Sequence, residues 1–255
     1  MKNAIDGFRS FEKVCFGKTE DAYDGFTTLL RDVIDKFNCL RILDVGGGAQ
    51  PQLSEAELDA RRLDYTVMDI SKAELERAPE VYKKIVMDIA SDSVPAAEKY
   101  DLVFSRFVAE HVKDAGRLHS NVFAMLRPGG VAIHFFPTLF ALPFFVNKML
   151  PEWLAVRFLS RERQERGKFP AYYQWCVGPT NGGIRRLELL GYEVLEYAGF
   201  FGHGYYDGFP VLRRLHRGFR GFLLRHPVSY LTSFAWIVLR KPESAGRSMS
   251  VSAGG

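Results

Sequence analysis

One short stretch, residues 41–50, constrains this chain more than any other. It is an apolar run that stops at an acid and then at three glycines, with the sequence Arg-Ile-Leu-Asp-Val-Gly-Gly-Gly-Ala-Gln. The apolar residues predict a buried parallel strand, and Gly46, Gly47 and Gly48 allow a sharp strand-to-helix turn because they carry no Cβ. A turn of this kind lets the edge of a ligand approach the backbone closely.

The residues after the glycines argue against two common nucleotide-binding motifs. A dinucleotide-binding turn has the pattern G-x-G-x-x-G, but counting from Gly46 places Pro51 where the third glycine would stand. A phosphate-binding P-loop needs Lys and then Ser or Thr after its last glycine, whereas Ala49 and Gln50 follow here. The turn is therefore typical of neither NAD-binding nor ATP-binding proteins.

Apolar stretches alternate with helical patterns along most of the chain. Helical spacing predicts a helix within residues 21–37 and another within 54–62. Seven stretches have the composition of strands: residues 42–45, 65–69, 84–89, 100–105, 131–135, 191–196 and 230–240. This alternation predicts an α/β fold with a doubly wound, mostly parallel sheet of seven strands. Residues 1–20 show little periodicity and are expected to form a flexible cap.

Three segments together resemble the class I S-adenosylmethionine-dependent methyltransferases. The glycine turn, preceded by Asp44, resembles motif I of that family, although Gln50 replaces its usual third glycine. The run S-R-F-V-A-E-H-V of residues 105–112 is similar to the segment after the family's fourth strand. Residues 127–130, Arg-Pro-Gly-Gly, match its L-x-P-G-G connection. The resemblance covers residues 25–137 and implies a small-molecule type of Rossmann-like methyltransferase, with S-adenosylmethionine as cofactor.

The resemblance also implies a cofactor site at the carboxyl edge of the sheet. Asp69 ends the second strand about 20 residues after the glycines, where an acid accepts hydrogen bonds from a ribose diol. Asp88 and Ile89 would lie beside the adenine ring, although either acid could instead cap the following turn. The residues expected to bind the cofactor are Asp44, Gly46, Gly47, Gly48, Gln50, Asp69, Ile70, Asp88, Ile89, Ser105, Arg106, Phe107 and His111.

Methyl transfer to a hydroxyl group calls for a general base and needs no metal. The sulfonium already activates the methyl group, so the main task of the protein is to align the acceptor. Histidine has a free pKa close to neutral pH, and the candidates at this edge are His111, His134 and His203, with Tyr173 as an accessory group. His111 could instead end a helix, and His134 could be buried beside the sheet.

Two regions depart from a minimal fold of this kind. Residues 138–185 follow the fifth strand and are rich in apolar and aromatic side chains, so we expect a helical lid over the substrate; a dimer interface or a local core is the alternative. Residues 199–210 combine glycines with rings, which is typical of a mobile loop. Residues 211–241 contain no Asp or Glu, and apolar residues interleave with arginines at helical spacing. Such a helix suits an anionic membrane surface or a phosphate-bearing substrate, or a solvated face packed on the core.

Length and composition set the remaining limits. A chain of 255 residues with 47% hydrophobic and 25% charged residues is sufficient for one α/β domain with an appendage. Three scattered cysteines indicate neither disulfides nor a metal site, and they fit a reducing cytoplasm. No signal peptide or transmembrane helix is expected, because the longest apolar stretch is broken by Pro137 and Pro143. We expect a cytoplasmic protein, peripheral on the inner face of the membrane where its basic helix contacts lipid.

The expected organisation has five parts. They are an N-terminal cap and helix (1–40), a cofactor-binding core (41–137), the lid (138–185), the rest of the core with the basic helix (186–243) and a disordered tail (244–255).

The sequence thus predicts O-methylation of a bulky amphiphilic small molecule, such as a lipid-linked sugar or glycolipid. Methylation of a quinone or another aromatic natural product is an alternative, and so is a catalytically silent methyltransferase-like binding module. Nucleic acid is not expected as substrate, because no Asn-Pro-Pro-aromatic motif follows the fourth strand. The methylated atom, and whether the protein is a monomer or a homodimer, stay open.

Overall fold

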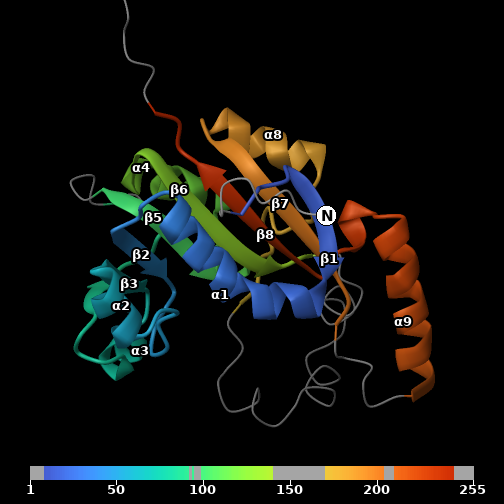
Figure 1. Ribbon diagram of the computed structural model, residues 1–255, viewed down its shortest axis with the longest axis horizontal. Coiled ribbons are helices and arrows are strands. Elements are labelled where there is room, and N and C mark those ends of the chain that lie inside the picture. Colours follow the sequence, from blue (N-terminus) through green and yellow to red (C-terminus); the bar gives the residue numbers. More distant parts are fainter. Residues whose placement is uncertain (1–8, 92–93, 95–98, 140–169, 204–209, 244–255) are drawn as a thin grey trace, which may run out of the picture.

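The computed structural model describes residues 9–91, 94, 99–139, 170–203 and 210–243, and in these the chain forms one α/β sheet with helices on both faces (Figure 1). The sheet has eight strands in the order β1-β7-β8-β6-β5-β2-β3-β4. Only β8 runs antiparallel to its neighbours. The strands are β1 Val14–Lys18, β2 Arg41–Val45, β3 Asp64–Asp69, β4 Lys83–Val86, β5 Tyr100–Arg106, β6 Leu126–Pro137, β7 Glu193–Phe201 and β8 Phe234–Arg240.

The helices divide between the two faces of the sheet. The α-helices are α1 Thr19–Lys36, α2 Glu55–Arg61, α3 Lys72–Arg77, α4 Ala115–Met125, α8 Asn181–Leu189 and α9 Pro210–Arg225, and the 3₁₀ turns are η1 Ala109–His111 and η2 Ser229–Leu231. Apolar residues of α1, α2 and α3 share one core with the sheet, and those of α4 and α8 share the other. The α/β, doubly wound prediction is therefore confirmed.

Helix α1 shows how the sequence produces this layering. Its buried residues Phe26, Leu29, Leu30 and Val33 recur at intervals of three and four, so they line one side of the helix. That stripe packs on the sheet, and the acids Glu20 and Asp21 occupy the first turn, where the helix dipole favours them.

The crevice of the sheet lies between β2 and β5. The chain proceeds from β2 to β3 on one side and from β5 to β6 on the other, so the order reverses between the two neighbouring strands. In open parallel sheets a ligand binds outside the carboxyl ends of the strands at such a reversal. The glycine turn of residues 46–48 follows β2 directly, at this position.

The sheet corrects three expectations. Residues 14–18, expected to belong to a flexible cap, form strand β1, which pairs in parallel with β7 and raises the number of strands from seven to eight. Residues 199–201, expected in a mobile loop, continue β7 and take part in that pairing. The strand expected to end at Ile89 ends at Val86, so Asp88 lies in the turn beyond it. In the first two cases the pairing of β1 with β7 decides the conformation, and in the third β4 ends at the last residue that pairs with β3.

Parts of the expected organisation lie outside the described residues: most of the lid (140–169), the centre of the loop before α9 (204–209), the first residues (1–8) and the tail (244–255). Helix α8 begins inside the stretch assigned to the lid, and it packs on β7. Within the described residues, no helix is both long and apolar enough to cross a membrane.

Candidate cofactor site

The glycine turn has no room for side chains. Gly46 and Gly48 have φ angles of +77° and +46°, in the left-handed region that favours glycine. A Cβ on Gly46 would stand 2.2 Å from Cγ2 of Val108, and one on Gly47 would stand 2.7 Å from Oδ2 of Asp44. The turn therefore presents bare backbone at the crevice, as close approach of a ligand requires.

Asp44 fixes the position of the glycine turn through hydrogen bonds to its side chain. Its carboxylate is buried, and Oδ2 accepts hydrogen bonds from the hydroxyl of Tyr65 at 2.6 Å and from the amide of Gln52 at 3.1 Å. Burial raises the pKa of Asp44 to about 6, the two hydrogen bonds oppose that rise, and the charge of Asp69 adds to it. Asp44 thus joins β2 to β3 and to the segment after the glycines.

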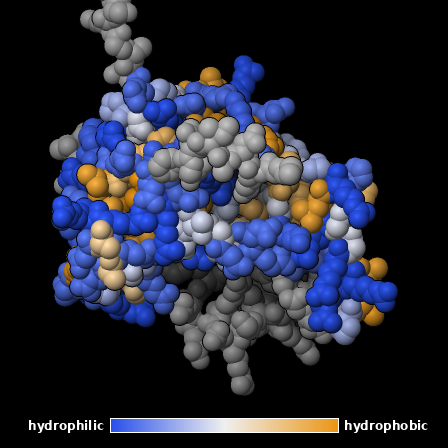
Figure 2. All heavy atoms as spheres, in the orientation of Figure 1, coloured by the Kyte–Doolittle hydropathy of each residue, from blue (hydrophilic) through white to orange (hydrophobic). Residues whose placement is uncertain are grey.

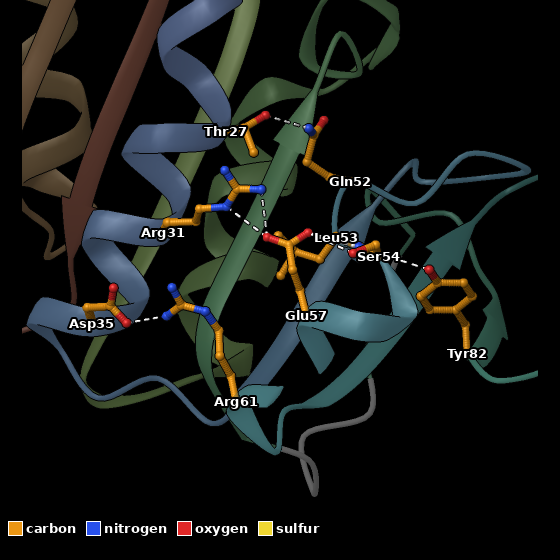
Figure 3. A network of polar contacts seen from close by, with 9 residues as sticks. All are labelled: Thr27, Arg31, Asp35, Gln52, Leu53, Ser54, Glu57, Arg61 and Tyr82. Carbon is orange, nitrogen blue, oxygen red and sulfur yellow. Dashed lines mark hydrogen bonds and ion pairs between the residues drawn. The ribbon is translucent and has the colours of Figure 1, made fainter. Parts of the chain in front are cut away.

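Gln52 fixes the far side of the turn, and the sequence reasoning missed it. Its side chain donates to Oγ1 of Thr27 on α1 at 2.9 Å (Figure 3). It also accepts from Nη1 of Arg106 at 3.0 Å. The backbone bond to Asp44 adds a third connection. Its position eight residues after a buried acid is too general a pattern to identify it from sequence.

A polar network ties α2 to α1 next to Gln52 (Figure 3). Arg31 pairs with Glu57 at 2.7 Å, and Asp35 pairs with Arg61. The hydroxyl of Tyr82 donates to the carbonyl oxygen of Leu53 at 2.9 Å. The loop between the glycines and α2 is therefore held from α1 and from the segment before β4.

The two carboxylate oxygens of Asp69 face different partners. Oδ1 accepts a hydrogen bond from the amide of Ser71 at 2.8 Å, and Ser71 is the residue that caps α3. Oδ2 of Asp69 lies 3.1 Å from where a Cβ on Gly48 would stand, so this oxygen faces the glycine turn. Ile70, the next residue, is 67% exposed. One carboxylate oxygen therefore fixes the turn before α3, and the other faces the glycine turn.

The segment after β4 places Asp88 and Ile89 differently. Asp88 is exposed, and its Oδ1 accepts from the amide of Ala90 at 2.8 Å, so it caps a turn. Ile89 is buried, and Asn121 on α4 donates to its carbonyl oxygen at 2.8 Å. The turn after β4 is thereby anchored to α4, which lies on the other face of the sheet from α3.

The carboxyl end of β5 carries a cluster of rings. Phe107 has a φ angle of +58° and donates its amide to the carbonyl oxygen of Phe135 at 2.8 Å. Its ring lies 4.8 Å from that of Phe135, 5.6 Å from Tyr23 and 6.2 Å from Phe234, between centroids. We call Tyr23, Phe107, Phe135 and Phe234 the aromatic cluster. Tyr23 is 40% exposed, so the cluster offers a ring to solvent.

Ser105 and His134 lie beneath this surface. Both are fully buried, and Oγ of Ser105 is 2.8 Å from Nδ1 of His134. His119 is also buried, its ring centroid 5.0 Å from that of His134. Burial lowers the pKa of His119 to about 4 and that of His134 well below its ordinary value, so both rings are neutral at neutral pH. A cavity of about 20 Å³ between α4 and α8, lined by His119, Trp175 and Arg186, has room for one water.

His111 and Tyr173 meet around Glu110. Nδ1 of His111 lies 3.0 Å from the carbonyl oxygen of Pro170, and its Nε2 lies 3.8 Å from Oε1 of Glu110. The backbone oxygen of Glu110 accepts hydrogen bonds from the amides of Tyr172 and Tyr173 at 2.7 and 3.0 Å. The residues that return from the insertion are therefore fastened to η1.

Glu110 is the second site residue that the sequence reasoning missed, although it adjoins His111 in the S-R-F-V-A-E-H-V run. Its side chain is buried, and Oε2 has no hydrogen-bond partner among the described residues. Burial raises its pKa to about 8. An acid beside a histidine is a common pair in surface turns, so the sequence alone did not mark it as buried.

His203 lies apart from these groups. Its ring centroid is 4.1 Å from that of His216, on α9. The four accessory or base candidates therefore divide: His111 and Tyr173 lie together at η1, His134 is buried within the sheet, and His203 lies beside α9.

The site has the features that S-adenosylmethionine needs. The bare turn 46–48 would hold the amino-acid and ribose parts of the cofactor, and Oδ2 of Asp69 faces this turn from the end of β3. Among the described residues no cluster of His, Cys, Asp and Glu could hold a metal ion.

Comparisons with known proteins agree with this geometry. Residues 19–170 match the model of a family described as "Methyltransferase domain". Two curated proteins from Mycobacterium sp., strains KMS and MCS, both called "Uncharacterized methyltransferase", are 34% identical over 95 residues. The match spans 36% of this chain and 36% of each relative, about a third of their length.

Solved structures share the fold. An S-adenosylmethionine-dependent methyltransferase from Mesorhizobium loti is 19% identical, with a TM-score of 0.51 over 85% of this chain and 99% of that one. A protein from Listeria monocytogenes, described as a putative S-adenosylmethionine-dependent methyltransferase, is 13% identical, with a TM-score of 0.54 over 87% of this chain and all (100%) of that one. The resemblance seen in the glycine turn is thereby confirmed: this chain belongs to the methyltransferase domain family.

Proposed function

We propose that this protein is an S-adenosylmethionine-dependent methyltransferase. The observation that carries the proposal is the bare glycine turn with Oδ2 of Asp69 facing it. Family membership supports the same activity. When bound, S-adenosylmethionine supplies an activated methyl group, which a nucleophile attacks in line with the bond that breaks.

The residues around Glu110 can take up the proton that the acceptor loses. The carbonyl oxygen of Pro170 can only accept, so the hydrogen bond at 3.0 Å assigns the proton of His111 to Nδ1. Nε2 is then the nitrogen that accepts a proton, and Oε1 of Glu110 lies 3.8 Å from it. His111 is the general base in this proposal; the carbonyl oxygen of Pro170 orients its ring, and the backbone amide of Tyr173 holds the neighbouring Glu110.

The proposed acceptor is a bulky amphiphilic molecule methylated on oxygen, such as a lipid-linked sugar or glycolipid. The exposed ring of Tyr23 in the aromatic cluster and the 40% exposed ring of Tyr172 supply apolar surface near the sheet's carboxyl edge. His134, fully buried, acts in this proposal only through Ser105. The proposal includes a peripheral contact with an anionic membrane surface, where such acceptors reside.

A catalytically silent binding module is the competing function, because Gln50 replaces a family glycine. The amide of Gln50 donates to the carbonyl oxygen of Gly47 at 3.0 Å, and its side chain is exposed. The turn therefore closes with glutamine in this position, which favours the enzyme over the silent module.

Calorimetry with S-adenosylmethionine and S-adenosylhomocysteine tests the proposal. We expect binding of both, and transfer of a labelled methyl group from the first to material extracted by organic solvent from membranes. If the protein binds the cofactor but transfers no methyl group to lipid extracts or to phenols, the proposed cofactor binding would stand and the proposed acceptor would be refuted. Absence of binding would favour the silent module.

A further inference from the structure

Helix α9 turns an apolar row outward. Val211, Leu215, Phe219 and Phe222 are 73%, 66%, 51% and 54% exposed. Their spacings of four, four and three place them on one side of a helix with about 3.6 residues per turn. A surface helix normally turns such a row toward its own core. Figure 1 shows α9 at the margin of the molecule, beyond β1.

The contacts that hold α9 use a different side of the helix. Arg220 pairs with Glu20 on α1 at 2.6 Å, and Leu223 is buried. The ring of His216 lies 4.1 Å from that of His203, between centroids, with the two planes tilted by 36°. The exposed row is thus not needed to attach α9 to the sheet. Glu20 lies at the start of α1 and His203 just after β7, so both attachments lie at the carboxyl edge of the sheet.

The polar side of α9 carries one sign of charge. The arginines of α9 are Arg213, Arg214, Arg217, Arg220 and Arg225, and the helix contains no Asp or Glu. On a helical wheel Arg214, Arg225 and Gly218 lie next to the exposed row, and Gly221 lies farther round, between Arg214 and Arg217. A Cβ on either glycine would meet no atom within 4 Å. Figure 2 shows hydrophobic and strongly hydrophilic atoms side by side over α9.

We propose that α9 binds an anionic lipid bilayer, with the row of Val211, Leu215, Phe219 and Phe222 in the acyl boundary and the bordering arginines among the headgroups. An exposed apolar row alone would suit a protein partner equally well. The purely positive flank selects an anionic layer, because each arginine near such a surface is attracted by its negative potential.

The turn that follows α9 carries further exposed apolar side chains. Val228, Tyr230 and Leu231 follow α9 closely and are 42%, 54% and 41% exposed. Tyrosine is favoured at the boundary between water and acyl chains. Since α9 is attached at the carboxyl edge, a bilayer bound there would adjoin the acceptor side of the site. That last step rests on the proposed function, whereas the binding of α9 to lipid does not.

The test compares three variants of the full-length chain. The row variant combines Leu215→Ser, Phe219→Ser and Phe222→Ser, and the charge variant combines Arg214→Ser, Arg217→Ser and Arg225→Ser. Leu189→Ser is the matched control, because Leu189 is an equally exposed apolar residue, at 78%, on α8. Each is sedimented with vesicles of phosphatidylcholine alone and of phosphatidylcholine with phosphatidylglycerol, at low and high salt.

We expect the wild type and the control to bind anionic vesicles at least tenfold more tightly than neutral ones. The row variant and the charge variant should each lose about tenfold in affinity, and only the charge variant should lose its salt dependence. Equal binding to both vesicle types, or unchanged binding by the row variant, would overturn the proposal. So would a row variant that changes only the oligomeric state, because the row would then join two copies of this chain. Calorimetry with S-adenosylmethionine on the same variants keeps a failure of lipid binding distinct from a failure of the proposed enzyme.

Discussion

Cγ2 of Val108 lies 2.2 Å from the position that a Cβ on Gly46 would occupy. The two residues follow different strands, β2 and β5, which are neighbours at the reversal of strand order. The carboxyl end of β5 therefore closes one side of the glycine turn. A glycine at position 46 is required by this contact as well as by its φ angle of +77°.

Gly46→Ala should destabilise the protein by roughly 2–4 kcal/mol, from the steric overlap and the left-handed backbone together. Adding Val108→Ala should recover part of that loss, because it removes the methyl group that overlaps. Urea denaturation of both variants measures the coupling. Gly182→Ala is the control: a Cβ there meets nothing within 4 Å, and alanine favours its helix α8, so stability should rise slightly. Equal losses with and without Val108→Ala would contradict the steric explanation.

Asp69→Asn should weaken S-adenosylmethionine binding by about tenfold to a hundredfold, because hydrogen bonds to a charged acceptor are lost from the ribose. The asparagine oxygen can still accept from the amide of Ser71, so the turn before α3 and the melting temperature should change little. Calorimetry measures the affinity. A variant that binds normally but unfolds more easily would show that the residue only holds this turn.

Glu110→Gln should flatten the dependence of stability on pH. The pKa of Glu110 is raised by burial to about 8 in the folded protein, against an ordinary value near 4.5, so the folded state holds a proton that the unfolded state has released. Wild-type stability is therefore fully present below about pH 4.5 and is lost as the pH rises through 8, at about 1.4 kcal/mol per pH unit from this group. Denaturation between pH 5 and pH 8.5 measures it. The glutamine variant, which cannot ionise, should lack this slope, and parallel curves for both proteins would refute the assignment.

Tyr65→Phe should cost about 1–3 kcal/mol, because it leaves a buried carboxylate with one partner fewer. The hydroxyl of Tyr65 opposes the rise in the pKa of Asp44, so this pKa should increase further above 6 in the variant. Tyr82→Phe is the matched control, since its hydroxyl donates to the neutral carbonyl oxygen of Leu53. Chemical denaturation should show the larger loss for Tyr65→Phe, and equal losses would argue against a charged Asp44.

The sequence predicted those parts of the molecule in which local pattern and tertiary context agree. The strand ending at Val45, the glycine turn and Asp69 at the end of β3 could be placed because apolar runs that stop at acids recur along one edge of a parallel sheet. Strand β1 could not be predicted in this way. Val14–Lys18 does not alternate between apolar and polar residues, and its extended conformation comes with its pairing to β7.

Burial was the property that sequence reasoning judged least well. Glu110 was not predicted to be buried, and for His134 burial was only one of two alternatives, yet the structure buries both. His111 keeps an exposed ring, at 41% of its side chain. A single polar residue carries no periodicity of its own, so its environment depends on elements that are distant in sequence. Gln52 was missed for the same reason.

Strand β1 has one further consequence. By pairing with β7 it occupies backbone amides and carbonyls that would otherwise line an open side of the sheet. With β1 in place, the edge of the sheet is a strand of five residues instead of the nine-residue β7. Removing β1 would expose β7 as the edge, and we expect this longer strand to pair more readily with extended segments of other copies.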